Sequence, residues 1–552
     1  MARDLSIDPV VAHVLLNRGI APEAMPEFLR PTRACLHDPG LLPDMEPAAE
    51  RLATAVRESQ SVCIYGDYDA DGSTAGALLH KFLVARGVKV TYYVPDRFEE
   101  GYGLNATAVI RVLTQHRPNL MVTVDCGVSG AAEIDTAVSL GADVIVTDHH
   151  LPPERLPSVP TVDPQRVDST YPQREICGAA VAYKLCLKTA ELLGEDPRGP
   201  AAELLELVAI GTVADIMPLV GENRFFVYHG LKRLRQTTSP GLLAMLQIAA
   251  LGKNGRLTAR DIGFGIGPRL NAAGRLETAR AAFDLLTTED NQQAWELADS
   301  LEKLNRERRE VESRLTELAH ERVRNLSLHE KWGLVVSGDG WHEGVVGLVA
   351  SRLCQRYNRP ALVVSVSGDT AKGSGRSTKT VDLHAALTDC ADLLTGFGGH
   401  HHAAGFSLPA ANLEALAERF EAAVRSRMTE DDLVPVIEYD CAIRGRMATL
   451  ELAQQLAALE PFGHGNPAPT LKLTDIEVAS VRVTNDGNHL QLTFRTDTRG
   501  QLKAFWPQAG QNAERVEVGA RVEAVGALTV DSWNGEDRAQ FTVSDLRYAA
   551  RG

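Results

Sequence analysis

Acidic and histidine residues follow four short apolar segments of this chain. They are Asp67, Asp69 and Asp71 after residues 61–66, Asp125 after 120–124, Asp148, His149 and His150 after 144–147, and Asp215 after 208–214. Carboxylate oxygens are the ligands that hard divalent ions such as Mg²⁺ and Mn²⁺ prefer, and imidazole also binds Mn²⁺ and Zn²⁺. A single Asp at such a position could instead cap a helix or form a turn. Four such positions in one chain favour a metal site.

The segments before these residues are too short for helices and rich in β-branched residues, which is typical of strands buried on both faces of a parallel sheet. Val144-Ile145-Val146 is an example. Between residues 48 and 124, helical and strand-like segments alternate, and this order predicts a doubly wound α/β sheet. Because parallel strands end at one edge of a sheet, side chains that are distant in sequence can meet there.

Two motifs add detail to this prediction. Asp69 and Asp71 are separated by one residue and followed by Gly72, so two carboxylates lie at a strand-to-helix turn where glycine permits close approach of a ligand. Asp67 supplies another carboxylate, and clustered carboxylates repel one another unless cations offset their charge. The side chains of His149 and His150 diverge because the residues are consecutive, so we expect only one of them to bind metal.

Composition limits the possible classes of protein. A chain of 552 residues is too long for one hydrophobic core, and three or four domains are expected. No segment approaches the roughly 20 apolar residues that cross a bilayer, and the first residues lack a secretory signal, so we expect a cytoplasmic protein without membrane attachment. The eight cysteines are scattered, which favours reduced thiols. The net charge of −15 restricts nucleic-acid binding to local clusters, such as the arginines between 256 and 280.

The rest of the chain predicts two α/β lobes with parallel-rich sheets, a connecting helix and a β-barrel. Residues 288–324 contain no Gly or Pro and have apolar residues at helical spacing, which predicts a helix of about 35 residues. Beyond residue 432, alternating strands with glycine turns predict an OB-fold. The predicted boundaries are 1–50 for a segment packing on the first lobe, 51–287 for that lobe, 288–327 for the helix, 328–428 for the second lobe and 434–552 for the barrel.

Two glycine-rich segments, 373–377 and 396–405, are predicted to be loops that hold phosphate through backbone amides and an arginine fork. Neither segment matches the Walker pattern, so a P-loop ATPase is not supported. Ordinary structural turns remain an alternative, as does a zinc tract for the three histidines 400–402. Residues 263–275 resemble a dinucleotide fingerprint only loosely, and we expect there a loop that carries Arg275.

Seven motifs, in this order, resemble those of the DHH phosphoesterase superfamily. They are YGDYDADG (65–72), VDCG (124–127), TDHH (147–150), VAD (213–215), NAAGR (271–275), GSGRS (373–377) and GGHHHAAG (398–405). The resemblance covers residues from about 50 to 430 and is strongest to members that degrade single-stranded DNA from its 5′ end. Those members also carry an OB domain after the second lobe.

The resemblance implies roles for individual residues. Asp71, Asp125, His149 and Asp215 would hold one metal ion, Asp69 and Asp125 would help to hold a second, and Asp125 would bridge the two. His150 would contact the scissile phosphate, so His150 and Asp125 are the catalytic candidates. Nucleotide phosphates would be held by Arg275, Ser374, Arg376, Gly399 and His400, with Arg280 added from the basic cluster. Relatives often have a ligating His where this chain has Tyr65.

The activity implied is that of a metal-dependent phosphodiesterase. It would be a single-strand-specific 5′ to 3′ DNA exonuclease that uses two divalent ions, Mn²⁺ or Mg²⁺, and releases 5′-mononucleotides in DNA repair and recombination. We expect a monomer whose partners are single-stranded DNA, a single-strand-binding protein and a helicase. Base-stacking candidates in the barrel, which could equally form its core, are Phe494, Phe505, Trp506 and Trp533.

Two alternative functions remain open. One is a relative that acts on short oligonucleotides or on 3′-phosphoadenosine phosphate, which the barrel and the long helix disfavour. The other is a degenerate DHH protein that serves as a replication scaffold, which the complete set of metal-ligand candidates disfavours.

Overall fold

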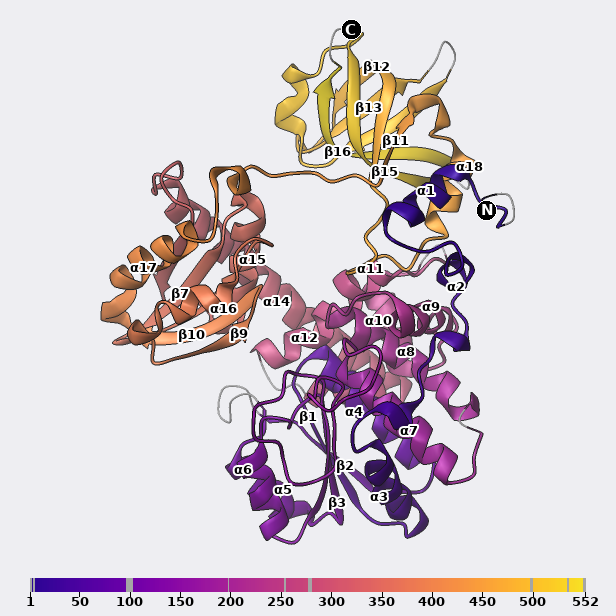
Figure 1. Ribbon diagram of the computed structural model, residues 1–552, viewed down its shortest axis with the longest axis vertical. Coiled ribbons are helices and arrows are strands. Elements are labelled where there is room, and N and C mark those ends of the chain that lie inside the picture. The colour runs from indigo at the N-terminus through magenta and orange to yellow at the C-terminus, as the bar shows by residue number, and fades with distance from the viewer. Residues whose placement is uncertain are drawn as a thin grey trace. The chain divides into compact units, whose positions relative to one another are not determined.

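The computed structural model describes residues 2, 5–95, 103–196, 198–252, 255–276, 280–496, 500–533 and 536–549. Its contacts divide the chain into two units. The first consists of Met1–Pro268, Ala282–Trp295 and Ile437–Gly552, and the second of Arg269–Ala281 and Glu296–Val436. The first unit contains a parallel sheet with its helices and the C-terminal barrel, whereas the second contains a mixed sheet (Figure 1).

The first lobe is built on a parallel sheet with the strand order β2-β1-β3-β4-β5. Its strands are β1 (Val62–Gly66), β2 (Val90–Tyr93), β3 (Leu120–Val124), β4 (Asp143–Thr147) and β5 (Thr161–Val162). Helices α5 (Ala106–His116) and α6 (Ala131–Ser139) cover one face, and α3 (Met45–Arg57), α4 (Ala70–Val84) and α7 (Gly178–Leu192) cover the other (Figure 1). Every residue of β1 and β3 is buried, so the predicted doubly wound sheet is confirmed.

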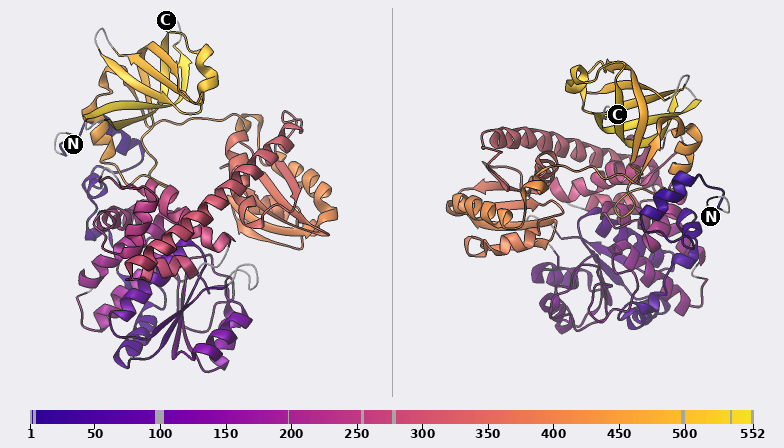
Figure 2. Two further views of the ribbon diagram at one scale, coloured as in Figure 1. Left: turned by 180° about the vertical axis from the view of Figure 1, so that it is seen from behind. Right: turned by 45° about the horizontal axis from the view of Figure 1, so that its top comes forward.

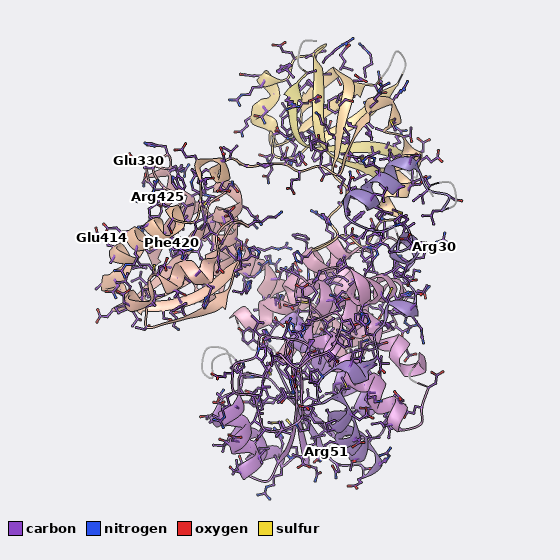
Figure 3. The ribbon with its side chains drawn as sticks, viewed as in Figure 1. Arg30, Arg51, Glu330, Glu414, Phe420 and Arg425 are labelled. Atoms are coloured by element: carbon purple, nitrogen blue, oxygen red, sulfur yellow. The ribbon has the colours of Figure 1, made fainter. Side chains whose placement is uncertain are left out.

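One ion pair marks the N-terminal edge of this sheet. Arg51 of α3, labelled in Figure 3, places its Nε 2.7 Å from Oδ2 of Asp143, the first residue of β4. Asp143 is largely exposed, and such pairs contribute at most about 1 kcal/mol. The acidic residues of interest follow the opposite, C-terminal ends of the strands.

Helices follow the sheet along the chain. They are α8 (Arg198–Ala214), α9 (Gly221–Leu234), α10 (Pro240–Ile248), α11 (Ala259–Asp261), a π-helical turn (Ile262–Ile266), α12 (Gly267–Leu276) and α13 (Arg280–Thr287). The prediction of a strand at 208–214 was therefore wrong, because this run is the end of α8. Helix α8 contacts α4, α7 and α9, so the run is buried on nearly all sides and shows no helical periodicity. The expected loop at 263–275 is also helical.

The N-terminal segment lies on two domains instead of on the first lobe alone. Helices α1 (Pro9–Asn17) and α2 (Met25–Leu29) contribute Val11, Leu15 and Met25 to the hydrophobic core of the barrel. The remainder of the segment packs on the first lobe: Arg33–Cys35 lies against α9, and Pro39–Leu41 and α3 lie against α7. The physical reason is that α1 is strongly apolar, and the barrel core offers it an apolar surface.

The predicted long helix is confirmed as α14 (Asn291–Arg324), which is continuous (Figure 2). It begins three residues later than predicted because Asp290 caps it: Oδ1 of Asp290 accepts a hydrogen bond of 2.7 Å from the amide of Gln293. Along the chain, α14 joins the first lobe to the second.

The second lobe has a mixed sheet in the order β6-β7-β8-β10-β9, in which β6 and β7 are parallel and the other pairs antiparallel. Its elements are β6 (Leu334–Asp339), α15 (Glu343–Tyr357), β7 (Ala361–Ser367), β8 (Thr370–Arg376), α16 (Leu383–Thr388), β9 (Gly396–His400), β10 (Ala403–Pro409) and α17 (Leu413–Arg425). Phe420 of α17 is buried in the core, and Arg425 donates to the carbonyl of Glu330 (Figure 3).

The glycine-rich segments predicted as loops are mostly strands. Residues 373–376 belong to β8 and residues 396–400 to β9. A Cβ at Gly373 would overlap the ring of Phe406, so glycine is required here for packing between neighbouring strands.

The C-terminal domain is a closed barrel, as predicted. Its elements are β11 (Cys441–Arg444), α18 (Leu450–Ala457), β12 (Leu471–Val483), β13 (Leu490–Arg495), β14 (Gln501–Trp506), β15 (Arg521–Trp533) and β16 (Glu536–Tyr548). The order β12-β13-β14-β16-β15 is closed by antiparallel pairing of β15 with β12. Phe494 is a core residue, Trp506 packs partly against the core, and the side chain of Trp533 lies outside the described residues.

All eight cysteines are among the described residues, and none forms a disulfide. Of the helices described, none is both long and apolar enough to cross a membrane.

Candidate metal centre

The predicted metal ligands lie together at the C-terminal edge of the parallel sheet. Asp67 follows β1, Asp125 follows β3 and His149 follows β4, while α4 and α8 contribute the rest. Among the described residues, side-chain atoms that lie within 4.8 Å of one another form three overlapping groups. The groups are Asp71, His149 and Asp215; Asp67, Asp69 and Asp125; and Asp125, His149 and His150. Asp125 and His149 each belong to two of them, and Asp125 links the group of Asp67 and Asp69 to His149.

Asp69 and Asp71 are fixed by backbone amides. Asp69 is the N-cap of α4, and its Oδ1 accepts hydrogen bonds from the amides of Asp71 (2.9 Å) and Gly72 (3.0 Å). The buried carboxylate of Asp71 accepts from the first amides of α7, Gly178 at 2.6 Å and Ala179 at 3.0 Å. The N-terminus of α7 thus stabilises this negative charge.

Asp125 is held in an unusual backbone conformation. Its φ is +60°, in the left-handed region that residues other than glycine, asparagine and aspartate seldom adopt, and residues in this region occur often at functional sites. A Cβ at Gly178 would lie only 2.7 Å from Cβ of Asp125 and 2.8 Å from its Oδ1. Glycine at the start of α7 therefore allows Asp125 to reach the centre.

His149 is a neutral imidazole surrounded by carboxylates. Its Nε2 lies 2.9 Å from Oδ1 of Asp125, 3.6 Å from Oδ2 of Asp215 and 3.8 Å from Oδ2 of Asp71. Burial, together with the charge of His150, lowers the pKa of His149 to about 4. At neutral pH the ring is therefore uncharged and suited to ligate a metal.

His150 differs from His149 in the charge of its ring at neutral pH. Its Nδ1 donates to Oδ1 of the buried Asp148 at 2.7 Å, and Oδ2 of Asp148 accepts from the amide of Val128 at 2.9 Å. Burial alone would lower the pKa of His150, but the hydrogen bond and the charge of Asp148 raise this pKa to about 9. The partly exposed ring is therefore cationic at neutral pH and can attract a phosphate.

Tyr65 does not replace a histidine ligand. Its hydroxyl donates to the carbonyl of Gly103 at 3.2 Å, and its ring packs against Tyr93. The third carboxylate beside Asp69 and Asp125 comes instead from Asp67. The sequence showed that Asp67 is acidic and adjacent, but not that its buried side chain joins this group.

This cluster is suited to bind divalent cations because several of its buried carboxylate oxygens accept no hydrogen bond. Oδ1 of Asp67, Oδ1 of Asp125 and Oδ2 of Asp215 are buried, and no hydrogen bond within the described part of the chain satisfies them. Buried polar atoms normally have partners, and clustered carboxylates are unfavourable without positive charge. Oxygen donors with one imidazole are the ligands of Mn²⁺ and Mg²⁺, and the convergence of this set agrees with the predicted two-ion site.

The predicted phosphate-binding residues of the second lobe lie in one sheet. Ser374 and Arg376 are on β8, and Gly399 and His400 on β9, with β10 between these strands. Arg376 Nη1 donates to the carbonyl of Gly375 at 2.8 Å and approaches Oγ of Ser374 at 3.4 Å. Gly399 has a φ of +144°, and a Cβ there would overlap the carbonyl of Ala403. The strand pairing thus requires glycine.

The two remaining candidates lie in the helices before α14. Arg275 belongs to α12, and its side chain is outside the described residues. Arg280 begins α13 and is exposed.

Comparison with known proteins agrees with the domains found. Residues 61–212 match the model of the DHH family N-terminal domain, residues 330–426 that of the DHHA1 domain and residues 439–545 that of the RecJ OB domain. The chain is 38% identical to single-stranded-DNA-specific exonuclease RecJ of Bacillus subtilis over 550 residues, which are 99% of this chain and 69% of that protein. This chain belongs to the RecJ family. Escherichia coli RecJ is 37% identical to it over 98% of this chain and 96% of its own length.

A solved structure from the RecJ family gives the same fold. Thermus thermophilus RecJ in complex with Mn²⁺ has a TM-score of 0.85 and 31% identity, covering 100% of this chain and 77% of that one. The same protein has also been solved with Mg²⁺. Family relatives therefore bind the ions that the donor set of this chain favours.

The acidic cluster predicts a pH-dependent stability. Burial, and then repulsion by neighbouring carboxylates, raises the pKa of Asp71 to about 6 and holds those of Asp67, Asp125 and Asp215 well above the ordinary value. The folded state then keeps protons that the unfolded state loses above about pH 4, so the free energy of unfolding of the metal-free protein falls as pH rises from about 4 through 6 and beyond.

Divalent ions should restore the stability that the metal-free protein loses as pH rises. Mn²⁺ at about a hundredfold over its Kd should stabilise the protein by about 2.7 kcal/mol. We expect thermal melts to show a larger rise in Tm with Mn²⁺ at pH 8 than at pH 5, where protons compete for the carboxylates. A rise of equal size at both pH values would contradict the carboxylate cluster as the binding site.

Proposed function

We propose that this chain is a metal-dependent exonuclease that removes 5′-mononucleotides from the 5′ end of single-stranded DNA with two divalent ions, Mn²⁺ or Mg²⁺. The observation that carries the proposal is the meeting of Asp67, Asp69, Asp71, Asp125, His149 and Asp215 at one sheet edge, with buried oxygens left unsatisfied. The substrate follows the printed names of the RecJ relatives. The direction of digestion follows the family resemblance.

The residues divide the chemical work between them. Asp71, His149 and Asp215 would hold one ion and Asp67 and Asp69 the other, with Asp125 shared between the two. When bound, such a pair of ions supplies an activated water and stabilises charge on the attacking and leaving oxygens of a phosphodiester. The protein itself contributes the fixed positions of the carboxylates, set by the amides of α4 and α7.

His150 would bind the scissile phosphate. Asp148 fixes its Nδ1–H and keeps the ring positively charged, so the ring can pair with a phosphate oxygen while its orientation is maintained. Ser374, Arg376, Gly399 and His400 would bind the phosphate of the terminal nucleotide, and Arg275 and Arg280 would contact the strand. We also propose that the protein is a monomer in the cytoplasm. It would act in repair and recombination, with a single-strand-binding protein and a helicase as partners.

The proposal is tested with 5′-labelled and 3′-labelled single strands of about thirty nucleotides. We expect Mn²⁺-dependent release of mononucleotides from the 5′ end, and much slower cleavage of blunt duplex DNA and of dinucleotides. Attack confined to the 3′ end would refute the direction. Faster turnover of dinucleotides than of long strands would favour the small-substrate alternative.

Replacement of Arg376 should affect substrate binding without affecting the metal centre. Arg376→Ala removes a partly buried guanidinium that makes charge-assisted contacts with phosphate, which are worth about 1.5–3 kcal/mol. We expect KM for single-stranded DNA to rise about tenfold or more while Mn²⁺ affinity is unchanged, as measured by steady-state kinetics and calorimetry. Arg419→Ala, in the same lobe and paired with Asp392, is the control and should behave like wild type. An unchanged KM for Arg376→Ala would remove this residue from the phosphate site.

A further inference from the structure

The turn that carries Asp215 is more exposed than the positions of Asp71 and Asp125. The side chain of Asp215 is 28% exposed, compared with 1% for Asp71 and 2% for Asp125. Its Oδ2 has no hydrogen bond within the described residues, and the next residue, Ile216, has a φ of +57°. The position of Asp215 therefore depends on how the turn after α8 is held.

Helix α8 holds only the beginning of this turn. The amides of Asp215 and Met217 bond back to the carbonyls of Gly211 (2.9 Å) and Thr212 (3.0 Å). Beyond Met217, the chain leaves α8 and runs toward α9. On the far side of the turn, residues 218–220, the first lobe gives part of the support: Nδ2 of Asn223 donates to the carbonyl of Pro218 at 3.1 Å and Nε2 of Gln173 to that of Val220 at 3.3 Å.

The barrel domain adds the support of Leu219, through residues 459–467, which we call the brace loop. The amide of Leu219 donates to the carbonyl of His464 at 2.7 Å. A Cβ at Gly463 would lie 2.8 Å from Cδ1 of Leu219, and a Cβ at Gly465 would lie 2.9 Å from Cβ of Pro218. Glycines in the brace loop thus permit direct contact with the chain four residues beyond a metal ligand.

The brace loop is itself rigid because of Asn466. This residue is 1% exposed, and its Nδ2 donates to the carbonyls of Leu459 (2.9 Å) and Pro461 (2.8 Å). Its Oδ1 accepts from Nη1 of Arg18 at 2.8 Å, so one buried amide side chain fastens the loop at several points. Buried polar groups that are fully bonded define a unique local conformation.

A buried arginine ties the loop to the first lobe. Arg224 of α9 donates through Nη2 to the carbonyls of Leu459 (3.1 Å) and Glu460 (2.9 Å) and through Nε to that of Phe28 (2.7 Å). Its positive charge is thus stabilised by backbone carbonyls from the brace loop and from α2. Helix α9 follows the Asp215 turn directly, so both ends of the connection are fixed.

From these contacts we infer that the brace loop positions Asp215 for metal binding, so that the C-terminal barrel domain is a structural part of the metal centre. Asn466 and Gly463 are then positioning residues: they touch neither substrate nor metal. The inference rests on the proposed function, because it takes Asp215 as a metal ligand. It adds that the barrel affects metal affinity even when no DNA is present.

Calorimetric titration of the full chain with Mn²⁺, without DNA, tests the inference. Asn466→Ala frees the brace loop, and we expect Mn²⁺ affinity to fall about tenfold or more, the range found for groups that orient metal ligands. Hydrogen exchange of the amides in residues 216–219 should also become faster. Asn488→Ala, an exposed asparagine of the same barrel, is the matched control and should bind Mn²⁺ like wild type.

Each outcome separates the inference from the proposed function. If Asn466→Ala is folded by circular dichroism and binds Mn²⁺ with wild-type affinity, the inference is overturned while the proposed function stands. If Asn466→Ala does not fold, Gly463→Ala decides by the same criterion, because its Cβ presses on Leu219 while the side chain of Asn466 keeps its partners Leu459, Pro461 and Arg18. Absence of Mn²⁺ binding in the wild-type chain would refute the proposed function itself.

Discussion

Asp125→Asn should abolish hydrolysis of single-stranded DNA while the protein remains folded. Asp125 lies in one group with Asp67 and Asp69, and its Oδ1 lies 2.9 Å from Nε2 of His149, so its loss would remove a ligand from both proposed ions at once. Because loss of even the groups that orient metal ligands costs about 10–100-fold, we expect turnover to fall by more than about a hundredfold. The measurement is the rate of mononucleotide release at saturating Mn²⁺, together with calorimetric Mn²⁺ affinity.

Asparagine is the appropriate replacement for two reasons. It is nearly the same size as aspartate and tolerates the left-handed backbone conformation that Asp125 adopts at φ +60°. It also removes one charge from a repelling cluster, so the metal-free variant should melt at a higher temperature than metal-free wild type. Wild-type turnover by Asp125→Asn would contradict the bridging role, and a lower Tm without metal would contradict the repulsion.

Gly211→Ala should weaken metal binding through packing alone. A Cβ at Gly211, on α8, would overlap Oδ1 of Asp71 and lie 2.8 Å from Oγ1 of Thr74. Overpacking of this kind costs about 1–3 kcal/mol of stability. Since Asp71 must move to relieve the overlap, we expect Mn²⁺ affinity to fall about 10–100-fold. Calorimetry and thermal melts with and without Mn²⁺ provide the measurement.

The same helix provides the control for Gly211→Ala. Gly199 also lies on α8, but a Cβ there would meet nothing within 4 Å. Gly199→Ala should therefore bind Mn²⁺ like wild type and be equally or slightly more stable, because alanine favours helix by up to about 1 kcal/mol over glycine. If both variants bound Mn²⁺ equally well, the close packing of α8 on Asp71 would have no part in the metal centre.

The metal centre could be predicted from the sequence where each ligand follows a local pattern. Asp71, Asp125 and His149 stand just after β1, β3 and β4 or at the turn that follows, and the geometry of a parallel sheet brings such positions together. Asp215 lies beside Asp71 and His149, but its segment was predicted as a strand. A helix buried on nearly all sides and a buried strand have the same apolar composition, so only tertiary structure distinguishes them.

Other features depend on long-range contacts that no local pattern encodes. Glycine is required at Gly373 of β8 and Gly399 of β9 because the ring of Phe406 and the backbone of β10 occupy the space where their side chains would lie. The packing of α1 in the barrel core joins residues more than 400 positions apart. The brace loop likewise reaches the Asp215 turn only through the folded arrangement of α9, α2 and the barrel.

Anomalous diffraction from crystals soaked in Mn²⁺ tests the central claim most directly. The account predicts two manganese peaks, one ligated by Asp71, His149 and Asp215, the other by Asp67 and Asp69, and both by Asp125. It is contradicted if Mn²⁺ at millimolar concentration gives no peak at this sheet edge, or if the ions bind elsewhere while these side chains keep their metal-free contacts.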